Sequence, residues 1–426
     1  MTPPPSLDAL IVSAEATAAL QAGGLAIERA EPAYVRHKPH ETTIIAYRLA
    51  LTQANATWGY AVWCEDAARA EQIHQKARTL GPRTSAAGPG LSRIDANTVF
   101  YAFPNDARLR RLRWYTDPRK LKRSLEPLTE VGERISGSRT TVEVLRYKPE
   151  RRVVTRVELA TTSHTRALLV RYSTRRQARH LSRVAIHLRG GGISTPAPVA
   201  QLEGGRVTVD EYTEGVQLYD AVRAGTVEPV TLANAIVDFH ATPAPRWTAQ
   251  RTAADDMERV VTGLADLGSW HRTLSGPAGQ LAAALRRHLP PAAGRTVLLH
   301  GDLHTKNLLA HDDRISFIDL ERVATGPAAI DLGFLNAHAI ALGLRQLGWS
   351  PNAQQHARLA TDHYQSVTHM IAPSELAWHT SLGLAEQALL VARHLEPQWQ
   401  HTSASLLHLA HHHLEKQQAP TPIIAQ

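Results

Sequence analysis

The strongest constraint on this chain comes from three short apolar runs that alternate with polar segments between residues 297 and 321. The runs at 297–299, 308–310 and 315–318 are each of strand length, and the turn-forming segment His-Asp-Asp-Arg separates the last two. This pattern predicts three strands, of which the last two form a hairpin. The polar segments His-Gly-Asp-Leu-His-Thr-Lys-Asn and Ile-Asp-Leu-Glu therefore lie in a loop and at a strand end.

Three oxygen-bearing side chains in these polar segments have the order and spacing that phosphoryl transfer from a nucleotide requires. Asp302 precedes Asn307 by five residues, and Asp319 follows the last apolar run. A carboxylate is needed to orient a hydroxyl nucleophile and to accept its proton, while an amide oxygen and a second carboxylate can hold Mg²⁺ at the triphosphate. Protein kinases use the same series of residue types.

The segments HGDLHTKN and IDLE, with GPAAIDLG at 326–333, together resemble the aminoglycoside phosphotransferase and choline kinase-like superfamily. The resemblance extends over residues 136–410 and is most specific in the C-terminal half. It implies a small-molecule kinase with a protein-kinase-like fold, in which Asp302 is the catalytic base. Asn307 and Asp319 would be the metal ligands.

The same resemblance implies supporting roles for two further residues. His300 would be structural, with its imidazole hydrogen-bonded to the loop backbone. Asp331 would be a buried aspartate that caps the following helix and braces the loop. In addition, we expect Glu321 to support the metal shell through a water molecule.

The expected fold is α+β, a protein-kinase-like bilobal fold with a small β-rich N-lobe and a large, mainly helical C-lobe. A chain of 426 residues has room for a further domain. We expect an additional α+β N-terminal domain at residues 1–135, the N-lobe at 136–212, and the helical C-lobe with the catalytic loop at 213–426. Apolar residues recur at intervals of three and four in much of the last segment, which predicts helices there.

An internal repeat suggests what the N-terminal domain is. Arg-His-Lys-Pro at 36–39 and Arg-Tyr-Lys-Pro at 146–149 each open a series of strand, polar loop, strand and helix. A repeated series of this kind predicts a repeated supersecondary unit. The N-terminal domain would then be a degenerate copy of the N-lobe that serves as a cap or in packing.

The expected N-lobe departs from the usual kinase pattern in the residues that hold the nucleotide. Arg171 stands where a strand-borne lysine is expected, and the helix predicted at 177–188 provides no glutamate to pair with it. Arginine is a competent phosphate ligand because it is permanently charged and can bind two oxygens. The turn that would cover the nucleotide carries Lys148 and Arg152 in place of glycines. We expect these three cations to bind the phosphates.

The segment Thr-Val-Asp-Glu-Tyr-Thr-Glu-Gly at 208–215 resembles the hinge between kinase lobes, because a short apolar strand ends there in polar residues. We expect Glu211, Tyr212 and Thr213 to bind adenine through backbone groups. The departures in the N-lobe leave two interpretations open, an active phosphotransferase and a pseudokinase that binds a ligand without turnover. The intact spacing of the three oxygen-bearing residues favours the active enzyme.

Charge is unevenly distributed along the chain. Residues 101–190 hold 22 Lys and Arg against 8 Asp and Glu. A basic segment attracts phosphate, whether on a nucleotide or on a nucleic acid. No helix-turn-helix, zinc-knuckle or aromatic RNA-binding motif accompanies it, so ATP phosphates explain the charge better than a nucleic-acid partner does.

Composition indicates the compartment in which the protein is expected. The single cysteine, Cys64, excludes an internal disulfide, and no apolar run has the length of a membrane span. The first residues lack the basic and apolar segments of a signal peptide, so we expect a cytoplasmic protein.

The expected reaction uses ATP and Mg²⁺ and transfers the γ-phosphoryl group to a small-molecule hydroxyl, on a sugar, an aminoglycoside or an amino alcohol. A peptide Ser or Thr stays open as an alternative acceptor.

Overall fold

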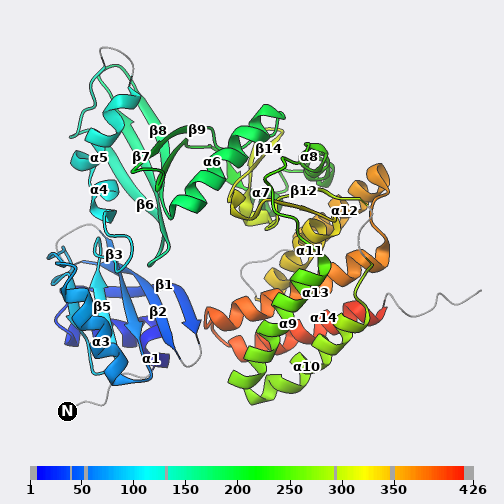
Figure 1. Cartoon of the computed structure of the whole chain (residues 1–426), viewed down its shortest axis with the longest axis horizontal. Helices are drawn as coiled ribbons and strands as arrows, with labels where there is room; N and C mark the ends of the chain where they lie inside the picture. The colour runs from blue at the N-terminus through cyan, green and yellow to red at the C-terminus, as the bar shows by residue number, and fades with distance from the viewer. Residues whose placement is uncertain are drawn as a thin grey trace, which may run out of the picture. The chain divides into compact units, whose positions relative to one another are not determined.

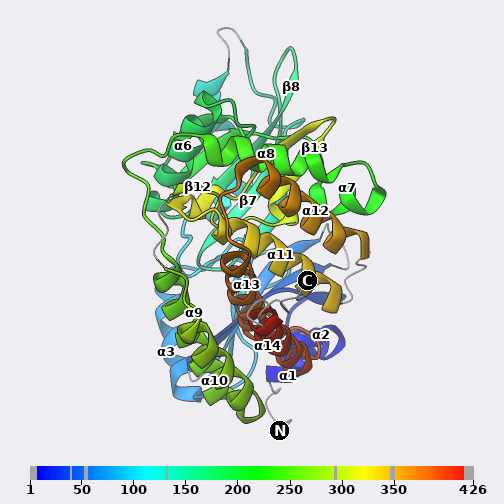
Figure 2. The same cartoon turned by 90° about the vertical axis from the view of Figure 1, so that its right-hand side faces the viewer.

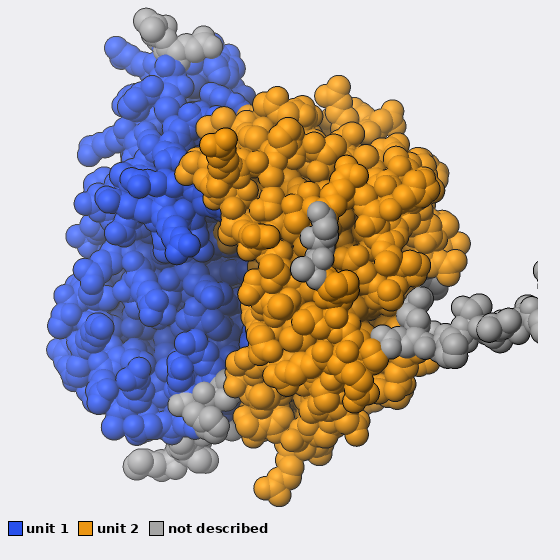
Figure 3. Space-filling model, turned by 45° about the vertical axis from the view of Figure 1, so that its right-hand side comes forward, with its two compact units in different colours: residues 1–182, 198–212, 393–395 blue, residues 183–197, 213–392, 396–426 orange. Residues whose placement is uncertain are grey.

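The chain divides into two compact units, each of which is described here by itself (Figure 3). The computed structural model describes residues 7–38, 41–51, 56–129, 133–291, 295–345 and 351–416. The first unit comprises residues 1–182, 198–212 and 393–395, and the second comprises residues 183–197, 213–392 and 396–426. Sheets dominate the first unit and helices dominate the second, so the fold is α+β as expected (Figure 1).

The first unit begins with a five-stranded antiparallel sheet in the spatial order β1-β2-β3-β5-β4. Its strands are β1 (Arg29–Lys38), β2 (Thr42–Ala50), β3 (Thr57–Trp63), β4 (Leu91–Arg93) and β5 (Thr98–Ala102), and its helices are α1 (Leu7–Ile11), α2 (Ser13–Ala22) and α3 (Ala67–Arg78). Aromatic and β-branched residues are frequent in β2 and β3, where both faces are mostly buried. The Tyr47 hydroxyl donates to the carbonyl of Leu10 at 2.9 Å and joins the sheet to α1.

A second antiparallel sheet of the first unit has the same topology, in the order β6-β7-β8-β10-β9. Its strands are β6 (Thr141–Lys148), β7 (Arg152–Ala160), β8 (Thr165–Tyr172), β9 (Pro198–Leu202) and β10 (Val207–Glu211), and α6 (Arg175–Gly190) follows β8. In both sheets three consecutive strands are followed by a helix and by two strands, the later of which takes the inner position. The sequence repeat thus coincides with a repeated topology. Descent of the N-terminal domain from a degenerate N-lobe stays a prediction.

The repeated tetrapeptides do not open the strands, which corrects the sequence interpretation. Each one ends an outer strand and enters a turn, since β1 ends at Lys38 and β6 ends at Lys148. Pro39 lies outside the described residues. Outer strands carry charged residues on their exposed side, so both segments read as polar coil in the sequence.

One hydrophobic core serves both sheets of the first unit. The linking helices α4 (Leu112–Thr116) and α5 (Pro118–Leu125) and the short η1 (Glu126–Leu128) lie between the sheets in sequence. The Tyr147 ring of β6 packs edge-on against Trp58, Tyr60 and Phe103 from the first sheet. Aromatic side chains bury large apolar areas and so contribute strongly to such a core. The boundary predicted at residue 135 separates two sheets that share a core, and the division into three domains stays a prediction.

The second unit is mainly helical. Its helices are α7 (Leu218–Ala224), α8 (Pro229–Ala241), α9 (Ala253–Trp270), α10 (Arg272–Arg287), α11 (Ala329–Leu344), α12 (Pro351–Thr368), α13 (Pro373–Arg393) and α14 (Trp399–Lys416). Helices α9 and α10 pack along each other, α10 contacts α14, and α8 packs along α12 (Figure 2). None of the described helices is long and apolar enough to cross a lipid bilayer.

Two small sheets in the second unit carry the predicted polar segments. One contains β11 (Val216–Gln217), β13 (Leu308–His311) and β14 (Arg314–Phe317), and the other pairs β12 (Val297–Leu299) with β15 (Ala324–Gly326). Short 3-10 turns occur at η2 (Thr305–Asn307) and η3 (Leu320–Arg322). The three strands predicted in this region are confirmed, and the last two pair as a hairpin.

Candidate active site

The predicted catalytic loop runs between the two small sheets of the second unit. β12 leads into the loop, η2 closes it, and β13 leads out. Leu308 and Phe317 are paired in the hairpin, and the Ile318 N–H donates to the carbonyl of Asn307 at 3.0 Å. Asn307 and Asp319 are therefore held at the same end of the β13–β14 hairpin.

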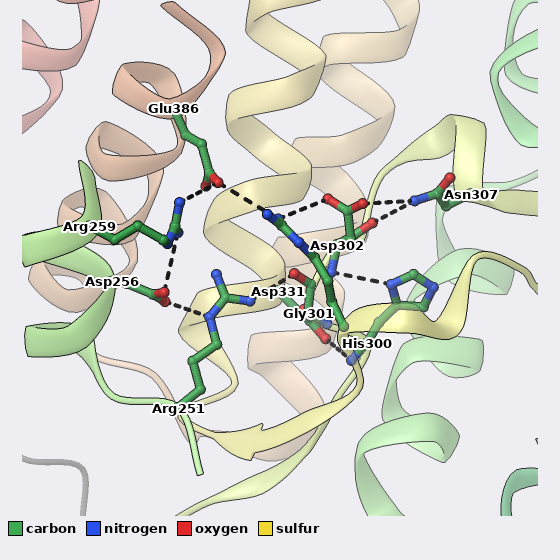
Figure 4. Close-up of polar contacts among 10 residues, drawn as sticks. Arg251, Asp256, Arg259, His300, Gly301, Asp302, Asn307, Asp331 and Glu386 are labelled. Atoms are coloured by element: carbon green, nitrogen blue, oxygen red, sulfur yellow. Dashed lines mark hydrogen bonds and ion pairs between the residues drawn. The ribbon is translucent and has the colours of Figure 1, made fainter. Parts of the chain in front are cut away.

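The side chain of Asn307 points back to Asp302 (Figure 4). Its Nδ2 donates to the backbone carbonyl of Asp302 at 3.0 Å and lies 3.5 Å from Asp302 Oδ2. Asn307 is buried, whereas Asp302 is partly exposed. Because the amide nitrogen is engaged, the amide oxygen is left as an acceptor. The loop thus offers an accessible carboxylate beside an oriented amide.

Asp331 fixes the backbone of the loop from α11. Its Oδ2 accepts from the His300 N–H at 2.6 Å, and its Oδ1 accepts from the Gly301 N–H at 2.8 Å. His240 Nε2 donates to Oδ2 at 3.2 Å. Burial raises the pKa of Asp331, but the hydrogen bond and charge of His240, with the Gly301 N–H, lower that pKa overall. The carboxylate is therefore charged while it holds the loop.

The predicted helix-capping role of Asp331 is wrong. The residue that begins α11 as its N-cap is Ala328, and Asp331 lies within the first turn. Its carboxylate accepts hydrogen bonds from N–H groups of the loop and is therefore not used to cap the helix.

Glycine is required at position 301 of the loop. Gly301 has a φ of +77°, a conformation that side chains other than glycine rarely adopt. A Cβ atom there would also lie 2.1 Å from the carbonyl oxygen of Arg322. The close approach to η3 places Asp302 directly after the turn.

His300 joins the loop to the end of β14. Its Nε2 donates to the carbonyl of Ile318 at 3.0 Å, and its Nδ1 accepts from the Asp302 N–H at 3.3 Å. The next residue along the chain, Asp319, has a φ of 59° and a ψ of 49°, a left-handed conformation that Asp adopts more readily than most residues. Such conformations gather at functional sites, where the surrounding structure holds them.

His304 of the loop packs against a buried histidine of α11. His304 stacks on His338 of α11, with ring centroids 4.3 Å apart and planes 11° apart. Burial lowers the pKa of His304 to about 4, and burial also lowers the pKa of His338. The pair therefore packs as uncharged rings, and neither ring carries an additional proton that it could donate.

A chain of charged groups behind Asp302 was not predicted from the sequence (Figure 4). Arg251 donates to the carbonyl of Gly301 and to Asp256, both at 2.7 Å. Arg259 bonds to Asp256 at 3.2 Å and to Glu386 of α13 at 2.7 Å. This chain of charged groups connects α9 and α13 to the catalytic loop.

Arg322 closes this chain of charged groups at its catalytic end. Its Nη1 lies 3.7 Å from Glu386 Oε1 and 3.5 Å from Asp302 Oδ1. The pKa of buried Glu386 is lowered by Arg259 and Arg322, which outweigh the effect of burial. Glu386 thus shares the charge of Arg322 with Asp302. Glu321, beside it in η3, is partly buried, and its support of a metal stays a prediction.

The three predicted phosphate ligands of the first unit lie on one face of the second sheet. Lys148 is paired with Arg152 across the β6–β7 turn, and Arg171 is paired with Val154 on β7. Directly paired residues point to the same face, and so do alternate residues of a strand. Lys148, Arg152 and Arg171 therefore share a face, opposite the one that faces the hydrophobic core.

The predicted hinge residues lie at the end of β10, where Glu211 is the last residue of the strand and Tyr212 follows it. The Glu211 carboxylate accepts two hydrogen bonds from Arg166 Nε at 2.9 and 3.1 Å, and the Tyr212 N–H donates to Ala167 at 3.0 Å. The Arg156 guanidinium lies 4.5 Å from the centroid of the Tyr212 ring. Adenine recognition by this segment stays a prediction, and any such contact uses groups other than the Tyr212 N–H.

The donors near the hairpin end suit Mg²⁺. Amide and carboxylate oxygens are hard ligands, and the Asn307 oxygen is free of the bond that its nitrogen makes to Asp302. Within the described ranges, no three His, Cys, Asp or Glu side chains cluster as a metal site. Mg²⁺ commonly takes one or two protein carboxylates and completes its octahedron with phosphate and water oxygens. Two protein ligands, Asn307 and Asp319, would therefore be enough for a Mg²⁺ site that also uses phosphate and water oxygens.

Comparison with known proteins places the chain in a family. A model of the phosphotransferase enzyme family matches residues 153–369, just over half of the chain. No curated protein matches the chain. Similar solved structures include an aminoglycoside-3'-phosphotransferase of type VIII, with 20% identity, coverage of 62% of this chain and 97% of that chain, and a TM-score of 0.42.

Two further solved structures are similar to the chain. Choline kinase from Cryptosporidium parvum Iowa II is 14% identical, with coverage of 66% of this chain and 91% of that chain and a TM-score of 0.49. A glucosamine kinase in complex with glucosamine, ADP and inorganic phosphate is 19% identical, with coverage of 66% and 84% and a TM-score of 0.47. The family match confirms the resemblance found in the sequence: the chain belongs to the phosphotransferase enzyme family.

Proposed function

We propose that the protein is an ATP- and Mg²⁺-dependent phosphotransferase that moves the γ-phosphoryl group to a hydroxyl group of a small molecule. The observation that carries the proposal is the partly exposed carboxylate of Asp302, next to the amide of Asn307. Asp331 fixes the loop that bears both groups. A preorganised carboxylate with oxygen ligands beside it is what transfer to a hydroxyl needs.

In this mechanism Asp302 orients the acceptor hydroxyl and takes its proton. The acceptor oxygen forms a bond to the γ-phosphorus while the bond to the β–γ bridging oxygen breaks, so that ADP leaves. The Asn307 amide oxygen and the Asp319 carboxylate would hold Mg²⁺. When bound, Mg²⁺ neutralises the charge of the phosphates.

The first unit supplies the cations for the nucleotide in this proposal. Arg171 binds a phosphate with its planar guanidinium, and Lys148 and Arg152 add charge from the β6–β7 turn. Backbone groups of residues 211–213 bind adenine. Arginine at the position of the usual lysine is compatible with this role because it carries a permanent charge and several donors.

The direct test is Asp302→Asn, which keeps the shape of the side chain and removes the base. We expect turnover to fall by at least about 10²-fold, the usual contribution of general-base catalysis. Mg-ATP should still raise the melting temperature, because Asp302 is not a nucleotide ligand. The companion variant Asp319→Ala should instead lose the Mg-dependent shift. Full turnover by Asp302→Asn would remove Asp302 from the mechanism.

The acceptor is found by measuring ADP release over a panel of sugars, aminoglycosides, amino alcohols and Ser/Thr peptides. Release stimulated by one class of small molecule supports the proposal. Release stimulated only by peptides would replace it with a peptide kinase. Absence of any thermal shift with ATP and Mg²⁺ would leave a pseudokinase instead.

A further inference from the structure

A buried chain of hydrogen bonds leads to Asp331 from two helices that lie outside the catalytic loop. His240 of α8 donates to the Asp331 carboxylate through Nε2 at 3.2 Å, and its Nδ1 shares a hydrogen bond with the Tyr364 hydroxyl of α12 at 2.9 Å. The rings of His240 and Tyr364 meet nearly edge-on, with their planes 82° apart. One imidazole thus links α12 to the residue that holds the loop.

The three side chains of this hydrogen-bonded chain lie away from bulk water. The side chains of His240 and Asp331 are 3% and 1% exposed, and Tyr364 is fully buried. Buried polar groups take hydrogen-bond partners within the protein, because leaving one of them unpaired is unfavourable. Each side chain here serves as a partner of the next, so the loss of one hydrogen bond affects its neighbour.

The chemistry of the groups decides which atoms carry hydrogens. Asp331 is charged, since its pKa is held below the usual value, and its oxygens therefore only accept. His240 Nε2 must then carry a hydrogen. The Tyr364 hydroxyl can donate to Nδ1 of a neutral imidazole or accept from Nδ1 of a charged one. Burial raises the pKa of Tyr364 to about 12, so the hydroxyl keeps its proton and can bond to His240 in either charge state.

This chain also sets the rotation of the Asp331 carboxylate. Oδ2 accepts from both His240 Nε2 and the His300 N–H, whereas Oδ1 accepts from the Gly301 N–H. The terminal torsion of an aspartate is soft, so its plane is set by bonds of this kind. Asp302 in turn donates its N–H to His300 Nδ1 at 3.3 Å. The position of Asp302 therefore depends on how firmly His240 holds Asp331.

A second buried imidazole joins the same region of the helices without reaching the loop. His356 of α12 is buried, and its Nε2 lies 3.0 Å from the carbonyl oxygen of Val227, in the segment that precedes α8. His356 contacts backbone there, whereas His240 continues to Asp331. If both histidines served only to join helices, their replacement would have the same consequences. His356 is therefore a natural comparison for His240.

We propose that His240 and Tyr364 are positioning residues for phosphoryl transfer, which act on Asp302 through Asp331. This inference rests on the proposed function and deepens it, because it extends the support of the catalytic loop to α12. His240 keeps the Asp331 carboxylate in the plane that both loop N–H groups need, and Tyr364 keeps the imidazole in its orientation. Small displacements of a base lower the rate steeply, since reacting groups must be held to within about 0.5 Å.

The test is Tyr364→Phe, which keeps the ring and removes the hydroxyl. We expect kcat to fall about tenfold, as one lost hydrogen bond in the support of a base would give. KM for Mg-ATP should not change, because neither His240 nor Tyr364 is a nucleotide ligand in the proposal. Tyr47→Phe is the matched control, since it removes an equally buried hydroxyl that donates to Leu10 at 2.9 Å in the first unit. Unchanged kcat in Tyr364→Phe, or an equal fall in the control, would overturn the proposal.

A double-mutant cycle shows whether Tyr364 acts through His240. His240→Gln keeps a donor for Asp331 but lacks the ring nitrogen that faces Tyr364, so it should lower kcat about tenfold, whereas His356→Gln should leave kcat unchanged. In the His240→Gln background, Tyr364→Phe should lower kcat by less than about twofold more. A further tenfold fall would show that Tyr364 acts independently of His240 and would refute the inference.

Amide hydrogen exchange of residues 300–302 gives a readout that does not need turnover. Exchange there should be faster in Tyr364→Phe than in Tyr47→Phe, because the loop N–H groups are held less firmly. Equal exchange in the two variants would contradict the proposal. If Tyr364→Phe does not fold, His240→Gln is held to the same criteria. Absence of turnover by the unmodified protein with every acceptor would sink the proposed function, whereas an active protein with unchanged kcat in both variants would sink this inference alone.

Discussion

At the scale of single residues, the catalytic loop depends on one buried carboxylate. Asp331 accepts hydrogen bonds from two consecutive N–H groups of the loop and from His240. Hydrogen bonds to charged groups contribute about 1.5–3 kcal/mol each. An uncharged replacement would leave buried donors poorly paired, so the position of Asp302 depends on the charge of a residue in α11.

We expect Asp331→Asn to lower the free energy of unfolding by about 3 kcal/mol, as removal of one partner from a buried charged set does. It should also lower kcat more than it changes KM for the nucleotide. Urea denaturation and steady-state kinetics measure the two effects. Asp312→Asn is the control, because Asp312 is exposed in the hairpin turn with a φ of 50° that Asn also adopts.

The same variant has a pH signature. The pKa of Asp331 is lowered by folding, so its stabilising effect is present above the unfolded value and is lost as the pH falls through the folded one. The unmodified protein should therefore lose stability below about pH 4, and Asp331→Asn should lose less over that range. Equal pH dependence of the two proteins would contradict a charged Asp331.

At the scale of secondary-structure elements, two helices hold the catalytic loop through the chain of charged groups. Asp256 and Arg259 come from α9, and Glu386 comes from α13. The side chain of Glu386 is 10% exposed and bonds to Arg259, whose side chain is 43% exposed. Loss of its charge would leave Asp302 as the remaining carboxylate beside Arg322, so the guanidinium would compete with the acceptor hydroxyl for Asp302.

We expect Glu386→Gln to destabilise the protein by about 2 kcal/mol, less than for a fully buried pair because Arg259 is partly exposed. It should also lower kcat, since Arg322 then competes with the acceptor hydroxyl for the Asp302 carboxylate. Denaturation and steady-state kinetics test both points. Glu258→Gln is the matched control, because Glu258 of α9 forms an exposed ion pair with Arg286. A kcat equal to that of the control would exclude Glu386 from this role.

The elements that the sequence predicted are those with local signals. The hairpin at 308–317 and the loop before it were predicted because strand length, turn residues and the spacing of Asp302 and Asn307 are all contiguous. The outer strands β1 and β6 were missed because their exposed faces alternate with charge. The contacts of Glu386 were missed because they join α9 to α13, and one sequence carries no signal for which distant charges meet.

At the scale of the whole molecule, the first unit ties its two sheets together with polar as well as apolar contacts. Asp106, which follows β5, accepts from the Tyr147 hydroxyl at 2.7 Å and from the Glu150 N–H at 2.9 Å. Arg36 of β1 forms an ion pair with Glu150 at 3.2 Å. Glu150 lies in the β6–β7 turn, which is the turn predicted to cover the nucleotide. The N-terminal residues thus brace that turn.

We expect Tyr147→Phe to lower the free energy of unfolding by about 2 kcal/mol, because it removes the hydrogen bond to Asp106 while keeping the ring in the core. Because the core is shared, amide hydrogen exchange should speed up in both sheets by a similar factor. Hydrogen-exchange mass spectrometry of the two sets of strands measures this directly. Faster exchange confined to β6–β10 would indicate that the sheets unfold separately.

The shared core also bears on where inactivating substitutions would be found in a genetic screen. Trp58 and Phe103 lie far outside the segment that the family model matches, yet both rings pack on Tyr147 at the end of β6. We expect substitutions at these two positions to reduce activity in the same way as substitutions near the β6–β7 turn. A mutational map restricted to the catalytic segment would therefore miss part of what keeps this enzyme working.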